Sequence, residues 1–232
     1  MIVVITGASK GLGKAFAEQF AANNILLLCA RNETVLNATA AGIKNKIPST
    51  TIYTKAVDLS VKEDVIAFAK WCLQFGAPDI LINNAGNFIQ GSVYNEPDGV
   101  LEEMLNINLM SAYYLSKTLL PNIIANTKNN NKHIFNICSI ASLQAYANGG
   151  SYSISKFALL GFSKNLREEL KPFNIKVTAV MPGAVYTDSW AGIDENRIMQ
   201  TSDIAKLVYT ASQLSPQACV EDIVIRPQLG DL

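Results

Sequence analysis

Short apolar runs alternate with longer stretches of mixed polarity along the whole chain. Most of the short runs are continuously apolar, which is typical of strands covered on both faces in a parallel sheet. Strands are predicted at residues 2–6, 25–30, 51–57, 80–83, 133–139, 176–180 and 223–225, and helical patterns lie at 11–23, 33–46, 62–75, 98–125, 152–171 and 202–214. The alternation predicts an α/β Rossmann fold: a doubly wound parallel sheet of about seven strands with helices on both faces.

The pattern contains neither a linker nor an internal repeat, so residues 1–232 are predicted to form a single domain. A polar stretch at 128–132 is expected to be a surface turn, and residues 188–200 are expected to form a substrate loop inserted after the sixth strand. Apolar residues make up 49% of the chain and charged residues 16%, which excludes a disordered protein.

Charge and the rarer residue types narrow the function. Lys plus Arg and Asp plus Glu number 19 each, so no global attraction to nucleic acid or to an anionic membrane is expected. One histidine, His133, cannot build a His-rich metal site, and no metal is predicted. The four cysteines, at 29, 72, 138 and 219, form no C-x-x-C pair and are expected to be reduced, buried thiols. With no targeting signal at the N-terminus, a cytoplasmic location is expected.

The first strand-to-helix turn, residues 6–13, has the sequence T-G-A-S-K-G-L-G. Small residues let a backbone approach a pyrophosphate, and the start of the following helix offers free N–H groups. The turn therefore predicts a dinucleotide site. At the end of the second strand the chain offers Arg31, with Lys10 in the glycine turn, while Glu33 already belongs to the next helix. Cations at this place favour the extra phosphate of NADP(H) over NAD(H).

Tyr152 and Lys156 are spaced so that both side chains lie on one face of a helix. A nearby ammonium stabilises a phenolate, lowers its pKa and makes the tyrosine a proton donor and acceptor for a carbonyl–alcohol pair. Roughly 0.5 such pairs are expected by chance in this chain, and Tyr113 with Lys117 forms another. Tyr152 starts a helix after a glycine-rich loop, whereas Tyr113 lies inside a long helix and is expected only to pack.

Three further motifs lie at predicted strand ends: N-N-A-G at 83–86, N-I-C-S at 136–139 and P-G-A-V-Y-T at 182–187. A fourth motif, N-I-N-L at 106–109, lies on the predicted helix that follows the fourth strand. Together with the glycine turn and the Tyr152–Lys156 pair, they resemble the short-chain dehydrogenase/reductase family over residues 2 to 188. The candidates follow the carboxyl ends of separate predicted strands, where doubly wound sheets bind their ligands. They are Gly7, Arg31, Asp58, Asn84, Ser139 and the Pro182-Gly183 pair.

The resemblance implies roles for matching residues. Ser139 would bind the substrate carbonyl oxygen, Tyr152 would transfer its proton, and Lys156 would hold the nicotinamide ribose. Asn108 would hold a water that links Lys156 to solvent, and Asp58 would meet the adenine. The implied cofactor-binding set is Gly7, Ser9, Lys10, Gly11, Leu12, Gly13, Arg31, Asp58, Leu59, Asn84, Ala85, Gly86, Tyr152, Lys156, Pro182, Gly183, Val185 and Thr187, in which Thr187 would anchor the carboxamide.

The predicted function is an NADP(H)-dependent oxidoreductase that interconverts a ketone or aldehyde with an alcohol by hydride transfer. One alternative is a β-ketoacyl-ACP reductase, whose acidic carrier protein needs a basic rim that Lys164, Arg167 and Lys171 could supply. A non-catalytic NADP(H)-binding regulator would need only the glycine turn. A methyltransferase, which also uses a doubly wound sheet, has no role for the Ser-Tyr-Lys set.

The expected substrate is a small carbonyl or alcohol, with an apolar or aromatic pocket rimmed by Phe88, Tyr146 and Trp190. The family's tetramer often uses the C-terminus, but this tail has no Gly-Gly turn before its last strand. A homodimer through the helices that contain Leu115 and Phe157 is therefore predicted, with a tetramer as the alternative.

Overall fold

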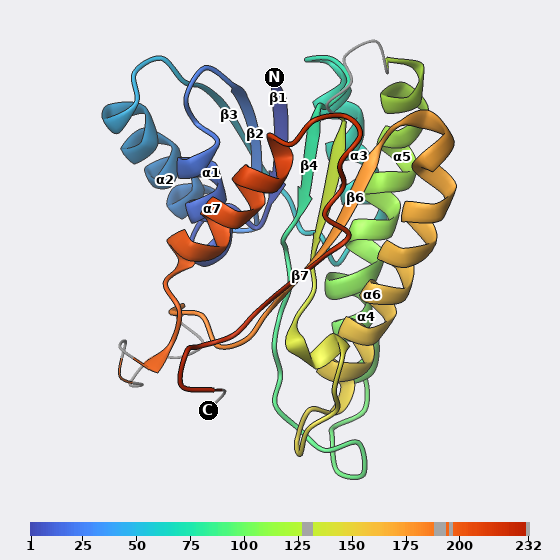
Figure 1. Ribbon diagram of the computed structural model, residues 1–232. Coiled ribbons are helices and arrows are strands. Elements are labelled where there is room, and N and C mark those ends of the chain that lie inside the picture. Colours follow the sequence, from blue (N-terminus) through green and yellow to red (C-terminus); the bar gives the residue numbers. More distant parts are fainter. Residues whose placement is uncertain (127–131, 188–193, 195–196, 231–232) are drawn as a thin grey trace.

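The computed structural model describes residues 1–126, 132–187, 194 and 197–230. Its centre is one seven-stranded sheet in the order β3-β2-β1-β4-β5-β6-β7, and every neighbouring pair is parallel (Figure 1). The strands are β1(Ile2–Thr6), β2(Ile25–Ala30), β3(Thr51–Ala56), β4(Ile80–Asn83), β5(His133–Ile137), β6(Lys176–Pro182) and β7(Asp222–Ile225). The predicted doubly wound α/β sheet is confirmed, and the strand order reverses between β1 and β4, where such sheets bind ligands.

Helices cover both faces of the sheet (Figure 1). On one face lie α1(Gly11–Gln19), α2(Glu33–Lys46) and α7(Thr201–Ser212), and on the other lie α3(Lys62–Leu73), α4(Val100–Leu105), α5(Ser111–Ala125) and α6(Gly150–Leu170). Phe16 of α1 and Phe20, directly after this helix, are fully buried on the first face, and Phe68 of α3 and Leu119 of α5 on the second. The layers are held together by the burial of apolar surface on each face, and each Å² buried contributes about 25 cal/mol of stabilisation.

The prediction of one continuous helix over residues 98–125 is wrong, because three elements occupy this segment. Between α4 and α5 the chain forms a π-helical turn, η1(Asn106–Met110), and Asn108 lies in this turn with only 1% of its surface exposed. A π-helical turn places one extra residue in the helix and changes the face that the following residues present. An apolar pattern of period 3.6 cannot reveal such a local change.

The buried polar groups at the amino end of the sheet are structural. Lys132 is 3% exposed, and its ammonium lies 2.8 Å from the Asp79 carboxylate, which also accepts a hydrogen bond from the Ile2 amide at 2.8 Å. The expected surface turn at 128–132 is therefore wrong at Lys132, and residues 128–131 lie outside the described part of the chain. Burial lowers the pKa of His133 to about 3, so this histidine is neutral where it contacts the Thr178 hydroxyl at 2.7 Å.

The cysteines follow the prediction in part: Cys29, Cys72 and Cys138 are buried, Cys219 is partly exposed, and all are free thiols. Among the described residues, no helix is long and apolar enough to span a membrane, and no cluster of acidic, His or Cys side chains is suited to a metal ion. On the helices predicted to form a dimer, Leu115 is fully buried in the core, whereas Phe157 is 44% exposed.

Candidate active site

The ends of β1 and β4 are joined by side-chain hydrogen bonds at the point where the strand order reverses. The Thr6 hydroxyl accepts hydrogen bonds from the Asn84 and Ala85 amides, each at 2.9 Å. The Asn84 side chain donates in return to the Thr6 and Gly7 carbonyls at 2.8 and 3.3 Å. The predicted residues Gly7, Asn84 and Ala85 thus lie together, while Thr6, to which the sequence analysis gave no role, holds them in place.

The glycine turn leads directly into α1. Gly7 has a φ of +65°, a conformation that glycine adopts at little cost. A Cβ added to Gly13 would lie 2.1 Å from the Gly7 carbonyl oxygen, so only glycine lets the helix start this close to the turn. No side chain at Gly7 or Gly13 therefore covers the free N–H groups at the start of α1. Exposed N–H groups at a helix start are the geometry that binds a pyrophosphate.

The ends of β2 and β3 carry the residues predicted to meet the adenosine half of the cofactor. Arg31 follows β2 and is exposed, and Glu33 starts α2, as the sequence analysis expected. Asp58 follows β3, where hydrogen bonds from Ser60, with a smaller contribution from Arg31, lower the pKa of its carboxyl group. Leu59 is 4% exposed and packs into the core beneath this end of the sheet.

Ser139, Tyr152 and Lys156 meet at the carboxyl end of β5. Ser139 follows β5, and its hydroxyl accepts a hydrogen bond from the Ala141 amide at 3.1 Å. Tyr152 and Lys156 lie on the first turns of α6, with the Lys156 ammonium 5.8 Å from the centre of the Tyr152 ring. Lys156 donates a hydrogen bond to the Ile137 carbonyl at 2.9 Å, which fixes α6 against the end of β5.

Burial controls the protonation of this group. It raises the pKa of Tyr152 above the usual range for tyrosine, although a hydrogen bond with Ser139 opposes the rise. It lowers the pKa of Lys156 to about 8 because the ammonium is shielded from water. The predicted lowering of the Tyr152 pKa by Lys156 is therefore wrong for the protein by itself, because burial has the larger effect. Tyr152 is a neutral phenol at pH 7 and can donate a proton.

Asn108 connects the site to the loop that follows β4. Its side-chain amide donates to the Asn87 carbonyl at 3.0 Å and to the Ser155 hydroxyl at 2.9 Å, and its oxygen accepts from the Asn87 amide at 2.8 Å. A Cβ on Gly86 would lie 2.9 Å from the Asn108 oxygen and 3.6 Å from the Lys156 nitrogen. Gly86, Asn108 and Lys156 are thus close neighbours.

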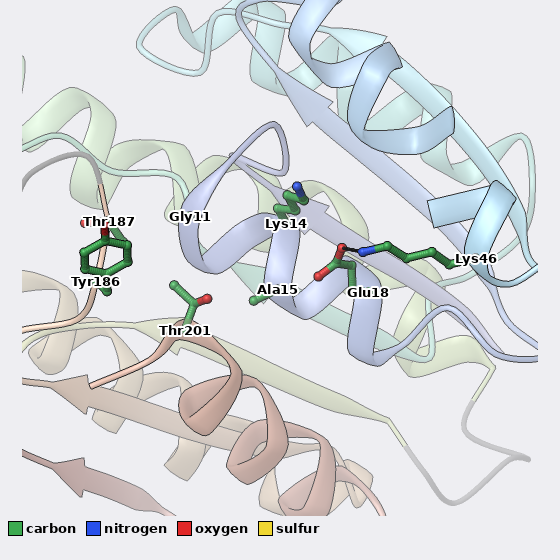
Figure 2. Close-up of a pocket in the computed structure, with 8 residues that line it drawn as sticks. All are labelled: Gly11, Lys14, Ala15, Glu18, Lys46, Tyr186, Thr187 and Thr201. Carbon is green, nitrogen blue, oxygen red and sulfur yellow. Dashed lines mark hydrogen bonds and ion pairs between the residues drawn. The ribbon is translucent and has the colours of Figure 1, made fainter. Parts of the chain in front are cut away.

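The segment after β6 brings Thr187 to the glycine turn. Pro182 ends β6, the Gly183 amide donates to the Ile225 carbonyl at 2.8 Å, and Val185 is buried in the core. Thr187 lines a cavity of about 460 Å³ together with Gly11, Lys14, Ala15, Glu18, Lys46, Tyr186 and Thr201 (Figure 2). This cavity follows the outer flank of α1, and Ser139, Tyr152 and Lys156 are not among its lining residues.

Comparison with known proteins gives the same family throughout. A family model described as short chain dehydrogenase matches residues 1–198. This chain belongs to the short-chain dehydrogenase/reductase family. Sepiapterin reductase of Chlorobaculum tepidum is 29% identical over 243 residues, which cover 100% of this chain and 98% of the relative.

Two solved oxidoreductase structures share the fold. A metagenomic short-chain oxidoreductase in complex with NADP is 28% identical, has a TM-score of 0.84 and covers 98% of this chain and 97% of its own. L-Sorbose reductase of Gluconobacter frateurii, complexed with NADPH and L-sorbose, is 26% identical with a TM-score of 0.88, over 97% of this chain and 94% of its own.

Aromatic side chains lie around Tyr152, the candidate proton donor of this short-chain dehydrogenase/reductase. The ring of Phe88 meets that of Tyr152 edge-on, with 4.8 Å between their centres. Phe88 and Tyr146 are 43% and 46% exposed, as expected for residues at the mouth of a site. Trp190, the other predicted rim residue, lies outside the described residues.

The basic residues that could have formed a rim for an acidic carrier protein do not surround the site. Lys164 pairs with Asp222, Arg167 with Glu221, and Lys171 with Glu168. Lys164 also lies twelve residues beyond Tyr152 on α6, which corresponds to about 18 Å along a helix. Each of these cations is thus paired with an acidic neighbour, two of them at or next to the start of β7 and one on α6 itself.

Thr6, Asn87 and Ser155 contact the predicted site residues, and sequence reasoning gave them no role. Thr6 stands directly before the first glycine of the turn, and that position was the one signal that could have drawn attention to it. Asn87 and Ser155 matter only through their contacts with Asn108. Those contacts depend on the π-helical turn, which leaves no mark in the sequence pattern.

Proposed function

We propose that this short-chain reductase interconverts a ketone or aldehyde with an alcohol, using NADP(H) and Tyr152 as the general acid and base. The observation that carries the proposal is the meeting of Ser139, Tyr152 and Lys156 beside the reversal point of the sheet, next to the glycine turn. A regulator that only binds the cofactor has no use for a partly buried phenol, a buried ammonium and a serine at one strand end.

The residues at the strand ends fit a dinucleotide. The crowded Gly7–Gly13 contact leaves the N–H groups at the start of α1 accessible, and Gly86 lets the loop after β4 approach Lys156 closely. A bound nicotinamide would supply or accept the hydride. Leu12 and Ser9 would line the turn, Asp58 and Leu59 would border the adenine, and Thr187 would hold the carboxamide end.

The chain's own residues would handle the oxygen and its proton. The Ser139 hydroxyl, held at the end of β5, would donate a hydrogen bond to the carbonyl oxygen. Tyr152 would give its phenolic proton to that oxygen during reduction and take it back during oxidation. Lys156 would stabilise the transient phenolate and bind the ribose, and Asn108 would hold a water that returns protons to Lys156.

The cofactor is NADP(H) rather than NAD(H). Both solved relatives described above are complexes with NADP or NADPH. In this chain the tip of β2 presents Arg31, and the nearest acidic residue that follows, Glu33, is built into α2. A cation at this tip suits the extra phosphate of NADP(H).

A β-ketoacyl-ACP reductase is the weaker alternative, because Lys164, Arg167 and Lys171 are paired with acidic neighbours far along α6. The aromatic mouth formed by Phe88 and Tyr146 instead suits an uncharged apolar or aromatic carbonyl compound. A homodimer through the exposed face around Phe157, and a cytoplasmic location, remain part of the proposal.

The test measures NADPH oxidation with a panel of ketones and aldehydes. The loss of the reduced-nicotinamide absorbance reports turnover. We expect turnover with at least one aromatic or aliphatic carbonyl, and little with an acyl-carrier-protein thioester. Tight NADPH binding without turnover of any carbonyl would favour the regulator. A strong preference for the carrier-bound substrate would favour the ketoacyl reductase.

A further inference from the structure

Glu96, in the loop between β4 and α4, is hydrogen-bonded to the first turn of α6, the helix that carries Tyr152. Its carboxylate accepts a hydrogen bond from the Ser151 amide at 2.7 Å and another from the Ser151 hydroxyl. Gly149, the residue that precedes α6, makes no side-chain cap. A carboxylate 55 residues away in sequence therefore satisfies a free N–H group at the start of α6 and complements the positive end of the helix dipole.

The surrounding backbone is shaped to admit this carboxylate. Gly150 has a φ of +38°, and a Cβ there would lie 1.7 Å from a Glu96 carboxylate oxygen. A Cβ on Gly91 would lie 2.8 Å from the Glu96 side chain. The Gly91 amide also donates to the Asn148 carbonyl at 3.2 Å. The loop after β4 and the loop before α6 are thus joined at several points near Glu96.

A second anchor holds the same loop against the same helix. Asn108 binds Asn87 at the start of the loop and Ser155 of α6, one helical turn beyond Ser151. Ser151 and Ser155 are 2% and 0% exposed. Phe88 lies on the loop between the two anchors and packs against the Tyr152 ring.

We propose that Glu96 is a positioning residue for catalysis: it fixes Tyr152 relative to the loop that carries Phe88. This inference rests on the proposed function. With Glu96 in place, the start of α6 and the loop that carries Phe88 are held together, so the phenol meets the carbonyl oxygen in a single orientation. Misplacing a catalytic group by about 1 Å can reduce a rate by about 100-fold. Cofactor binding should not depend on Glu96, because the glycine turn lies elsewhere and Lys156 is held separately by its hydrogen bond to the Ile137 carbonyl.

The experiment compares Glu96→Ala, Glu96→Gln and the control Glu102→Ala in the full-length protein. Glu102 is an exposed carboxylate on the neighbouring helix α4. We expect Glu96→Ala to lower kcat for carbonyl reduction by about 10-fold to 100-fold, with the NADPH dissociation constant unchanged within about twofold. Glu96→Gln should recover most of the loss, because its amide oxygen can still accept from the Ser151 amide. Glu102→Ala should match the parent.

Hydrogen exchange provides a readout that does not depend on turnover. In Glu96→Ala the amides of Ser151 and its neighbours should exchange faster than in the parent, and in Glu102→Ala they should not. A parent that binds NADPH but reduces no carbonyl would refute the proposed function, while the exchange data would still report on Glu96. Parental kcat in Glu96→Ala, or equal losses in the Ala and Gln variants, would refute the positioning role. If Glu96→Ala does not fold, Ser151→Ala takes its place: a loss of about threefold in kcat supports the role, and parental kcat overturns it.

Discussion

Two tyrosines in this chain lie at nearly the same distance from a lysine ammonium, and the proposed function assigns proton transfer to only one of them, Tyr152. The Lys156 ammonium lies 5.8 Å from the centre of the Tyr152 ring, and the Lys117 ammonium lies 5.6 Å from the centre of the Tyr113 ring. Tyr152 lies at the carboxyl end of β5 beside Ser139. Tyr113 is 37% exposed and packs edge-on against Phe162. Phe variants of the two tyrosines therefore show whether activity depends on a nearby ammonium alone or also on the position of the tyrosine in the fold.

Removing the Tyr152 hydroxyl should abolish proton transfer without disturbing the packing. Phe at this position keeps the ring contact with Phe88, and the lost hydrogen bond with Ser139 is worth about 1 kcal/mol of stability. Loss of a general acid costs about two to four decades in kcat, which corresponds to about 3–5 kcal/mol of transition-state stabilisation. Tyr113→Phe removes a hydroxyl from α5, where the ring contacts Phe162, and should lower kcat by less than about threefold.

The assay measures kcat, the NADPH dissociation constant and the melting temperature of both variants and the parent. Tyr152→Phe should lose turnover while it keeps NADPH affinity and folding. Equal losses in the two variants would show that the reasoning from position is wrong. Full activity in Tyr152→Phe would show that another group supplies the proton.

Three further changes test other parts of the structure. Lys156→Ala should weaken NADPH binding and raise the pH at which alcohol oxidation reaches half its maximum, because the catalytic phenolate loses its cation; an unchanged pH profile would limit Lys156 to binding ribose. Arg31→Ala should lower the preference for NADPH over NADH by about tenfold or more, since a charge-assisted contact to phosphate is worth about 1.5–3 kcal/mol, whereas Lys14→Ala should not; a parent that uses both cofactors equally well would contradict this. Asp79→Asn should lower the free energy of unfolding in urea by about 3 kcal/mol by stranding the buried Lys132 ammonium, with kcat unchanged; a loss below about 1 kcal/mol would show that the pair contributes little.

The sheet could be predicted from the sequence because parallel strands are buried on both faces. Runs such as Ile25–Ala30 are apolar at every position and start and end where expected. Turn chemistry then placed the candidate site, because the residues after each run must gather at one edge of a parallel sheet. Gly7 and Gly13 were equally informative, because their spacing predicts a tight turn from strand to helix.

The features that escaped prediction depend on contacts between segments far apart in the chain. Glu96 and Ser151 are 55 residues apart, and neither belongs to a recognisable motif. The π-helical turn at Asn108 is a local rearrangement of a helix whose apolar pattern continues through it. In the sequence, Lys132 does not differ from the other residues of its polar stretch. Its burial depends on the ion pair with Asp79, which lies 53 residues away. The pKa of Tyr152 likewise depends on how deeply the fold buries the phenol, which spacing alone does not show.

Buried polar contacts explain why the catalytic helix keeps one register against the sheet. Apolar surfaces let a helix slide with little change in buried area, whereas a hydrogen-bonded buried group permits one arrangement. The Asn83 side chain donates to Asn136 at 2.8 Å, Asn136 donates to Ser163 of α6 at 2.9 Å, and Lys156 donates to the end of β5. A shift of α6 by one residue would break the two contacts that α6 makes, through Ser163 and Lys156, at a cost of about 1–3 kcal/mol each. The position of Tyr152 is therefore set from the interior of the protein as well as from the loop at its mouth.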